Sequence, residues 1–299
     1  MSEQKINKDL QPGVPLSARR GVGGEAEFYI GWQPKAPSSF AKHIRKVLLI
    51  LFPVALVIGY LLSTSQKKFS TANFEFGKTT EIKGVYFNSP VPMLKVFDKN
   101  NLSITLPLVG YGKHGAETAI MELEKEKGVS LNGKEITLKG TLIYGDSKTL
   151  LQVDKNDNPI VSIGAESSVQ LEQNDLGMKS IRGEIIDPKC YFGVMKPGEG
   201  KAHRDCAIRC ILGGIPPVLH VQNEKGESNY YLIVGPNGEK MNEVVQDFVA
   251  EPVSIEARAV QQGDWIILYA GKESIKRISY AQLRNPDVKV LACVPGCIK

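Results

Sequence analysis

Hydrophobic and polar positions divide the chain into an N-terminal arm, one long apolar run and a body of short alternating segments. Residues 47–62 carry no charge, and uncharged polar residues extend the run to position 66. This length approaches what a helix needs to cross a bilayer, and a proline such as Pro53 is tolerated inside lipid as a kink. The run therefore predicts a transmembrane helix over 47–66.

Two other interpretations of the apolar run are a cleaved signal peptide and a core helix of a soluble protein. A signal peptide follows a short basic segment, whereas 46 residues precede this run, and no small-x-small cleavage pattern follows Leu62. A core helix would carry a polar face, which this run lacks. The membrane anchor therefore explains the pattern best.

Short alternating segments after the run form a degenerate repeat. Each copy has the order strand, strand, strand, helix, strand, strand, with helical segments expected near 116–127 and 239–249. Five short strands with one helix in this position resemble the OB-fold. We therefore predict a mainly β protein with two tandem OB-like domains, each a five-stranded barrel plus a helix, over 74–169 and 176–278. A pair of small α+β sandwiches is the alternative.

The two copies differ at one connection. The first joins its first two strands by a short turn at 88–90, whereas the second carries an insertion over 187–217 in the same place. Three of the five cysteines and one of the four histidines lie in this insertion. A long loop without hydrophobic periodicity needs a covalent or metal clamp, because core burial does not offset its backbone entropy.

Cysteine and histidine in this insertion have the spacing of a metal site. Thiolates and neutral imidazole are the ligands that zinc and softer metals prefer. Cys206 and Cys210 are expected on one face of a short helix, because side chains four residues apart lie one above the other. The predicted four-coordinate set is Cys190, His203, Cys206 and Cys210.

Disulfide bonds are the alternative use of these cysteines. Cys190 can pair with Cys206 or Cys210, and the Cys-x3-Cys of the C-terminal tail over 279–299 can pair within itself or with the remaining thiol. The tail pair, Cys293 and Cys297, can also fold back as additional metal ligands. A redox-active thiol pair is a third interpretation, although Cys-x3-Cys is not the Cys-x-x-Cys spacing that tunes dithiol enzymes.

The identity of the metal depends on the surrounding residues. Cys206-x3-Cys210 is similar to the thiolate pair of the binuclear copper centre in respiratory oxidases, and Met195 and His220 are further candidate copper ligands. That centre needs a histidine and a methionine where this chain has Gly214 and Pro217. A closed structural zinc site is therefore preferred, followed by copper and then by an iron–sulfur cluster.

Composition and charge restrict the partners. The 299 residues are 42% hydrophobic and 23% charged, which is typical of globular domains, and the formal net charge is +5. No basic block is interleaved with aromatic residues, so we expect no nucleic-acid binding. Basic residues near the apolar run are in excess before it, which favours a cytoplasmic arm over 1–46 and an exported body. Those before the run are Lys5, Lys8, Arg19, Arg20, Lys35, Lys42, Arg45 and Lys46, and those after it are Lys67, Lys68 and Lys78.

The arm over 1–46 is rich in glycine and proline and shows no periodicity, so it is expected to be irregular. Its segment Phe28-Tyr29-Ile30-Gly31-Trp32 is aromatic for a free tail. Such a segment lies at the membrane interface or docks on another subunit. We therefore expect the segment 28–32 and the cysteine loop to contact a protein partner.

The segment 187–195, the Gly213-Gly214-Ile215-Pro216-Pro217 exit and the Glu27-Phe28-Tyr29-Ile30-Gly31 of the arm resemble a group of uncharacterised bacterial single-span membrane proteins. This resemblance implies a bacterial envelope protein, acting as an accessory of a respiratory or other membrane redox complex. From this resemblance together with the predicted anchor and the basic residues around it, we expect an inner-membrane protein with periplasmic domains. No Ser-His-Asp spacing, P-loop or dinucleotide motif is present, so a non-catalytic role is expected. The alternatives are an electron-transfer protein with copper or an iron–sulfur cluster, and a thiol–disulfide oxidoreductase.

Overall fold

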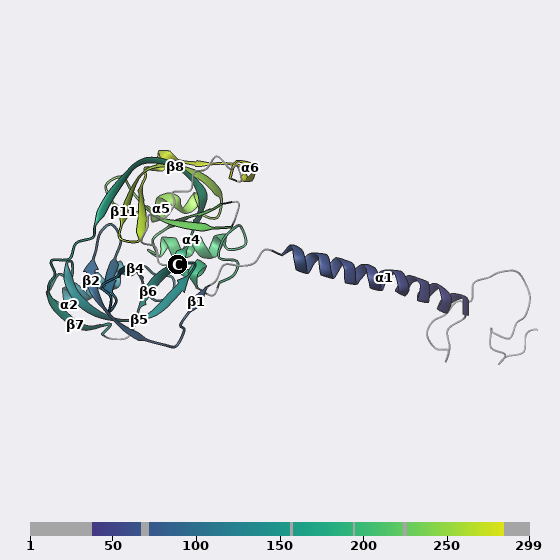
Figure 1. The fold of residues 1–299 in the computed structure, drawn as a ribbon, viewed down its shortest axis with the longest axis horizontal. Helices are drawn as coiled ribbons and strands as arrows, with labels where there is room; N and C mark the ends of the chain where they lie inside the picture. Colours follow the sequence, from purple (N-terminus) through teal and green to yellow (C-terminus); the bar gives the residue numbers. More distant parts are fainter. Residues whose placement is uncertain (1–37, 67–71, 156–157, 194, 224–225, 284–299) are drawn as a thin grey trace, which may run out of the picture. The chain divides into compact units, whose positions relative to one another are not determined.

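The computed structural model describes residues 38–66, 72–155, 158–193, 195–223 and 226–283. The chain forms two compact units, Met1–Lys68 and Phe69–Lys299. Figure 1 shows helix α1 of the first unit and the β-barrels of the second unit. The aromatic segment 28–32 and the two tail cysteines, Cys293 and Cys297, lie outside the described residues.

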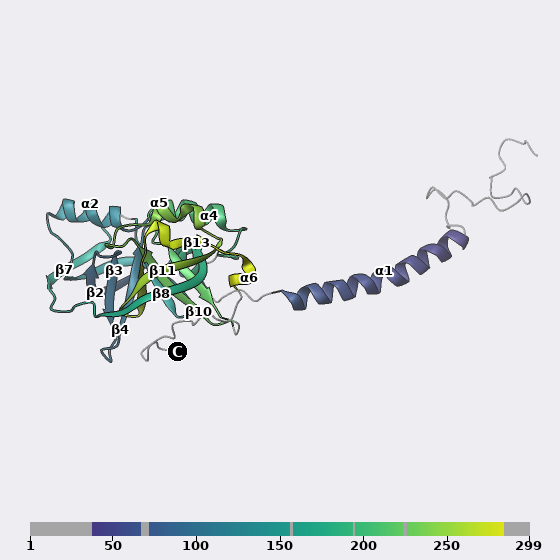
Figure 2. The same ribbon diagram turned by 90° about the horizontal axis from the view of Figure 1, so that it is seen from above.

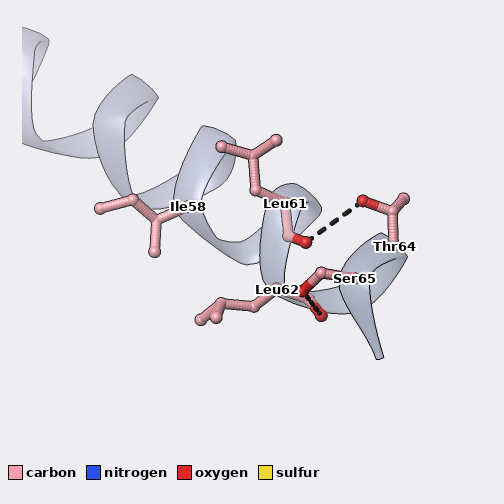
Figure 3. A pocket seen from close by; sticks show the side chains of 5 residues that line it. All are labelled: Ile58, Leu61, Leu62, Thr64 and Ser65. Atoms are coloured by element: carbon pink, nitrogen blue, oxygen red, sulfur yellow. Dashed lines mark hydrogen bonds between the residues drawn. The ribbon is translucent and has the colours of Figure 1, made fainter. Parts of the chain in front are cut away.

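The first unit contains helix α1 (Ser38–Ser65), in which Phe40–Ser65 is long and apolar enough to cross a membrane. At a rise of about 1.5 Å per residue it exceeds the ~30 Å thickness of a hydrocarbon core. The helix starts nine residues earlier than the predicted 47–66, because it also includes the basic segment with Lys42, Arg45 and Lys46. At its end, the Thr64 and Ser65 hydroxyls donate to the carbonyls of Leu61 and Leu62 (Figure 3), so these polar side chains bond to the backbone of their own helix.

The first barrel of the second unit closes through five strands in the order β5-β2-β3-β4-β6, because β6 also pairs with β5. All pairs are antiparallel except β4 with β6. Helix α2 (Glu117–Lys127) connects β4 to β5, and β1 (Asn73–Phe74) and β7 (Ile160–Glu166) extend the sheet on β5. The barrel strands are β2 (Thr80–Phe87), β3 (Met93–Phe97), β4 (Ser103–Val109), β5 (Lys134–Gly145) and β6 (Lys148–Val153).

The second barrel repeats this topology in the order β8-β9-β10-β12-β11, closed by β11 with β8, and β10 pairs with β12 in parallel. Helix α5 (Asn242–Val245) and the 3-10 turn η2 (Gln246–Phe248) connect β10 to β11, while β13 (Ile275–Arg277) adds to β11. The barrel strands are β8 (Gln173–Ile186), β9 (Val218–Gln222), β10 (Ser228–Val234), β11 (Pro252–Gln262) and β12 (Trp265–Tyr269). The prediction of two tandem OB-like barrels is thus confirmed.

The predicted helix of the second copy is shorter than the segment 239–249. A tight turn precedes it, in which Gly235 N donates to Glu239 O at 2.7 Å and Gly238 adopts a φ of +88°. Such a φ favours glycine and cannot continue a helix. Glu239 accepts a hydrogen bond within this turn, and the α-helix begins only at Asn242. A last short helix, α6 (Tyr280–Leu283), and the turn η3 (Lys272–Ser274) complete the described elements of this barrel.

Three hydrophobic cores hold the second unit together. One fills each barrel, and the third, called the inter-barrel core below, contains side chains of both barrels. Trp265 is fully buried there, and its indole N–H donates to Thr105 O of the first barrel at 3.0 Å. Asp264 accepts from Thr105 N at 2.7 Å beside it. Fully buried members of the inter-barrel core include Met93, Val109 and Ile143 from the first barrel and Phe192, Ile215, Val218 and Ile267 from the second.

Candidate metal centre

The cysteine insertion forms two short helices between β8 and β9. Helix α3 (Pro188–Phe192) carries Cys190, and α4 (Arg204–Leu212) carries Cys206 and Cys210 on one face, as predicted. Asp187 caps α3, because its Oδ1 accepts from Lys189 N at 2.9 Å. In Figure 2, α2, α5 and α4 lie along the same side of the barrels.

The insertion packs against the first barrel. Phe192 is fully buried, Tyr191 is nearly so, and both belong to the inter-barrel core together with Cys210. Cys190 and Cys206 are half-buried beside them. The cysteines therefore lie at the junction of the two barrels, which makes their chemistry part of the contact between domains.

Potential metal ligands gather here in two overlapping groups. Cys190, Cys206 and Cys210 form one group, and Asp187, Cys190 and His203 form the other; within each, the ligand atoms lie within 4.8 Å of one another. The Cys190 and Cys206 sulfurs are 4.0 Å apart. Two thiolates that bind one tetrahedral ion at about 2.3 Å lie about 3.8 Å apart, so this separation fits an ion bound between them. These groups can hold a metal ion.

Two polar atoms in the second group lack a hydrogen-bond partner within the described part of the chain. They are Asp187 Oδ2 and His203 Nε2, and both residues are more than nine-tenths buried. Leaving such an atom unsatisfied costs roughly 1–3 kcal/mol. Carboxylate and imidazole atoms of this kind are ones that a bound cation can satisfy, so these atoms add to the indication that the cysteine spacing gives.

The first barrel supplies two electrostatic contacts to the centre through segment 110–115. Lys113 Nζ donates to Cys206 Sγ at 3.3 Å. In the other direction, the buried Lys189 donates to Gly110 O and Gly112 O at 2.7 and 2.6 Å. Positive charge at these two positions suits a centre whose cysteines would bind a metal as thiolates. Segment 110–115 therefore contacts both Cys206 of the centre and Lys189 of helix α3.

A close backbone approach fixes the same segment against the end of α4. Gly115 N donates to Gly213 O at 2.9 Å. A Cβ added at Gly213 would lie 1.9 Å from Lys113 O, and one added at Gly115 would lie 2.1 Å from Gly214 O. Glycine is therefore required at this seam because any side chain would force the two backbones apart. The Gly-Gly of the exit segment serves packing between the barrels.

Burial and neighbouring charges shift the pKa of several groups at the centre. Hydrogen bonding with Cys210, burial and the Asp187 charge raise the pKa of the Cys190 thiol. Burial lowers the pKa of Lys189 to about 8 and also lowers the pKa of His203. A neutral His203 can ligate a metal, whereas Cys190 without a metal is a thiol rather than a reactive thiolate.

The structure places the other predicted ligands differently. Met195 lies after α3 with 46% of its surface exposed. His220 lies in β9, where Nδ1 is 3.0 Å from Glu199 and Nε2 is 3.0 Å from Ser228 Oγ, and it belongs to neither ligand group. The tail pair Cys293 and Cys297 lies outside the described residues. The disulfide alternative also involved Cys190, Cys206 and Cys210. In the structure these three cysteines are free thiols.

Sequence reasoning missed three residues of the centre, Asp187, Lys113 and Lys189. Asp187 had a local signal, because Asp followed by Pro is typical of a helix start with Asp as the cap. Lys113 had none, since it lies 93 residues from Cys206 in the chain. The predicted set of Cys190, His203, Cys206 and Cys210 spans both groups, with Cys190 in common.

No family model matches this chain, and a search of curated proteins found no matching sequence. Function is therefore inferred from the geometry of the centre and from helix α1.

Proposed function

We propose that this protein is a membrane-anchored, non-catalytic subunit whose cysteine centre binds zinc and thereby clamps its two barrels together. The observation that carries the proposal is the convergence of three thiols with two unpartnered buried polar atoms at the junction of the barrels. Structural zinc contributes directly to folding energy. Such an ion would supply the order that a long insertion cannot obtain from its own core.

The raised pKa of the Cys190 thiol does not favour the alternative of a thiol–disulfide oxidoreductase. Enzymes of that kind need a thiolate with a lowered pKa. In addition, Cys210 is 2% exposed, so a substrate disulfide would have little access to it. These two features weigh against a redox-active thiol pair.

The membrane assignment follows from α1 and from basic residues around it. The helix is long and apolar enough to span a bilayer, and the excess of lysine and arginine before it favours a cytoplasmic arm. We infer a bacterial inner-membrane protein with periplasmic barrels, and a role as an accessory of a respiratory or other redox complex. The aromatic segment 28–32 is suited to contact such a partner.

The test is to purify the full chain from bacterial membranes in detergent and measure bound metals by elemental mass spectrometry. Free thiols are counted on the unfolded protein. We expect zinc to remain bound, and we expect the triple variant C190S/C206S/C210S to lose it. The matched control is C293S/C297S, which removes the tail cysteines and should keep the metal.

Absence of any metal, together with disulfide-bonded Cys190, Cys206 or Cys210, would overturn the proposal and leave a covalent clamp. Stoichiometric copper or iron with a visible absorption band would replace zinc and indicate electron transfer. Orientation is tested by protease treatment of spheroplasts, which should degrade the barrels and spare the arm.

A further inference from the structure

We propose that the centre binds two metal ions bridged by the thiolate of Cys190. This inference rests on the proposed metal-binding function and adds a second ion. The two ligand groups have Cys190 as their common member, and each of the groups is compact, with ligand atoms within 4.8 Å of one another. A thiolate has more than one lone pair, so it can bind an ion on each side.

The first subsite consists of sulfur alone. Cys206 and Cys210 come from one face of α4, and Cys190 comes from α3. The 4.0 Å separation of the Cys190 and Cys206 sulfurs suits bonds to a common ion. Cys210 is 2% exposed, whereas Cys206 is half-buried and accepts from exposed Lys113. Cys206 therefore marks the side of this subsite that is open to solvent.

The second subsite has a mixed ligand set of carboxylate, imidazole and the shared thiolate. Asp187 is fully buried and His203 is 5% exposed. Each has a side-chain atom without a hydrogen-bond partner within the described residues, Oδ2 and Nε2 respectively. A single ion bound only by the three sulfurs would leave both atoms unsatisfied in the interior. The geometry therefore points to an ion of its own for this pair.

The test uses the full chain in detergent with the tail changes C293S/C297S, stripped of metal by a chelator under reducing conditions. Cobalt(II) is then titrated, because its thiolate charge-transfer band reports sulfur ligation and its total uptake gives the stoichiometry. We expect two equivalents of Co²⁺ in this parent. H203A should bind one equivalent and keep the thiolate band, whereas C206S should weaken that band and keep one equivalent.

A conservative variant guards against misfolding. D187N retains the capping oxygen of Asp187, which accepts from Lys189 N, but removes the charge of the second subsite, so it should also bind one equivalent. H114A is the matched histidine control, because His114 is exposed and outside both groups, and it should bind two. Trp265 fluorescence, read in a W32F background, verifies the fold of each variant.

Each outcome decides between the hypotheses. One equivalent in the parent, lost alike in H203A and C206S, would overturn the two-ion centre and favour a single four-ligand ion. No cobalt uptake in the parent would instead overturn the metal-binding function itself. Two equivalents that are unaffected by H203A and D187N would exclude these residues as the second subsite.

Discussion

Substitution of Gly213 by alanine tests whether the end of α4 is locked against the first barrel. The added Cβ would lie 1.9 Å from Lys113 O, whereas ordinary contacts begin near 3.4 Å, so the backbones must separate by roughly 1.5 Å. Such overpacking costs roughly 1–3 kcal/mol. Loss of the hydrogen bond from Gly115 N to Gly213 O adds about 1 kcal/mol.

One effect acts in the opposite direction. Alanine lowers the conformational entropy of the unfolded chain, which stabilises the folded state by about 0.5–1 kcal/mol. The net expectation for G213A is a destabilisation of about 2 kcal/mol. G115A should act in the same direction, because its Cβ would lie 2.1 Å from Gly214 O on the other side of the seam.

Urea unfolding followed by tryptophan fluorescence is the suitable assay. The chain has two tryptophans, and in a W32F background the signal comes from Trp265 in the inter-barrel core. The matched control is L212A, since Leu212 precedes Gly213 on α4 and is 45% exposed; its expected change is within about 0.5 kcal/mol. If G213A and G115A have the same urea unfolding midpoint as L212A, the close backbone approach at this seam does not stabilise the contact between the barrels.

Two further predictions concern pH and metal. Hydrogen bonds from Arg277 and Arg204 lower the pKa of Glu251, so this carboxylate stabilises the fold above its unfolded pKa and loses the effect as pH falls through its lower folded value. E251Q should lower the free energy of unfolding by about 1 kcal/mol at neutral pH and leave it unchanged in acid. Urea unfolding of both proteins across pH measures this difference. A difference that does not change with pH would contradict the prediction. Removal of zinc by a chelator should destabilise the protein that retains Cys190, Cys206 and Cys210. The expected loss is about 2.7 kcal/mol if free zinc had been at 100 times its dissociation constant. The same treatment should leave the stability of C190S/C206S/C210S unchanged.

The barrels were predictable because their strands alternate and their order repeats. The inter-barrel core left a subtler signal in Tyr230-Tyr231-Leu232-Ile233-Val234, which is apolar without alternation. A strand of this kind is buried on both faces. In the structure, Tyr231 and Ile233 point into the barrel core, while Tyr230, Leu232 and Val234 belong to the inter-barrel core.

The candidate centre was predictable only where its ligands are close in sequence. Cys206 and Cys210 have helical spacing, so their common face on α4 follows from local geometry. The division of ligands into two groups depends on where α3 places Cys190 relative to α4, and this depends on tertiary packing. Lys113 contacts Cys206 only because the first barrel packs on the second. A local pattern cannot encode that contact.

The place of the insertion explains how one loop joins two copies of a fold. In an OB-fold, the loop between the first two strands is one of those that bind ligands. Here that loop is long only in the second copy, and its helices α3 and α4 contact segment 110–115 of the first barrel. The first barrel therefore occupies the position of a ligand for the second. Because the candidate ligands lie in this contact, a zinc ion bound there would join the barrels, and its removal should loosen them from each other before either barrel unfolds.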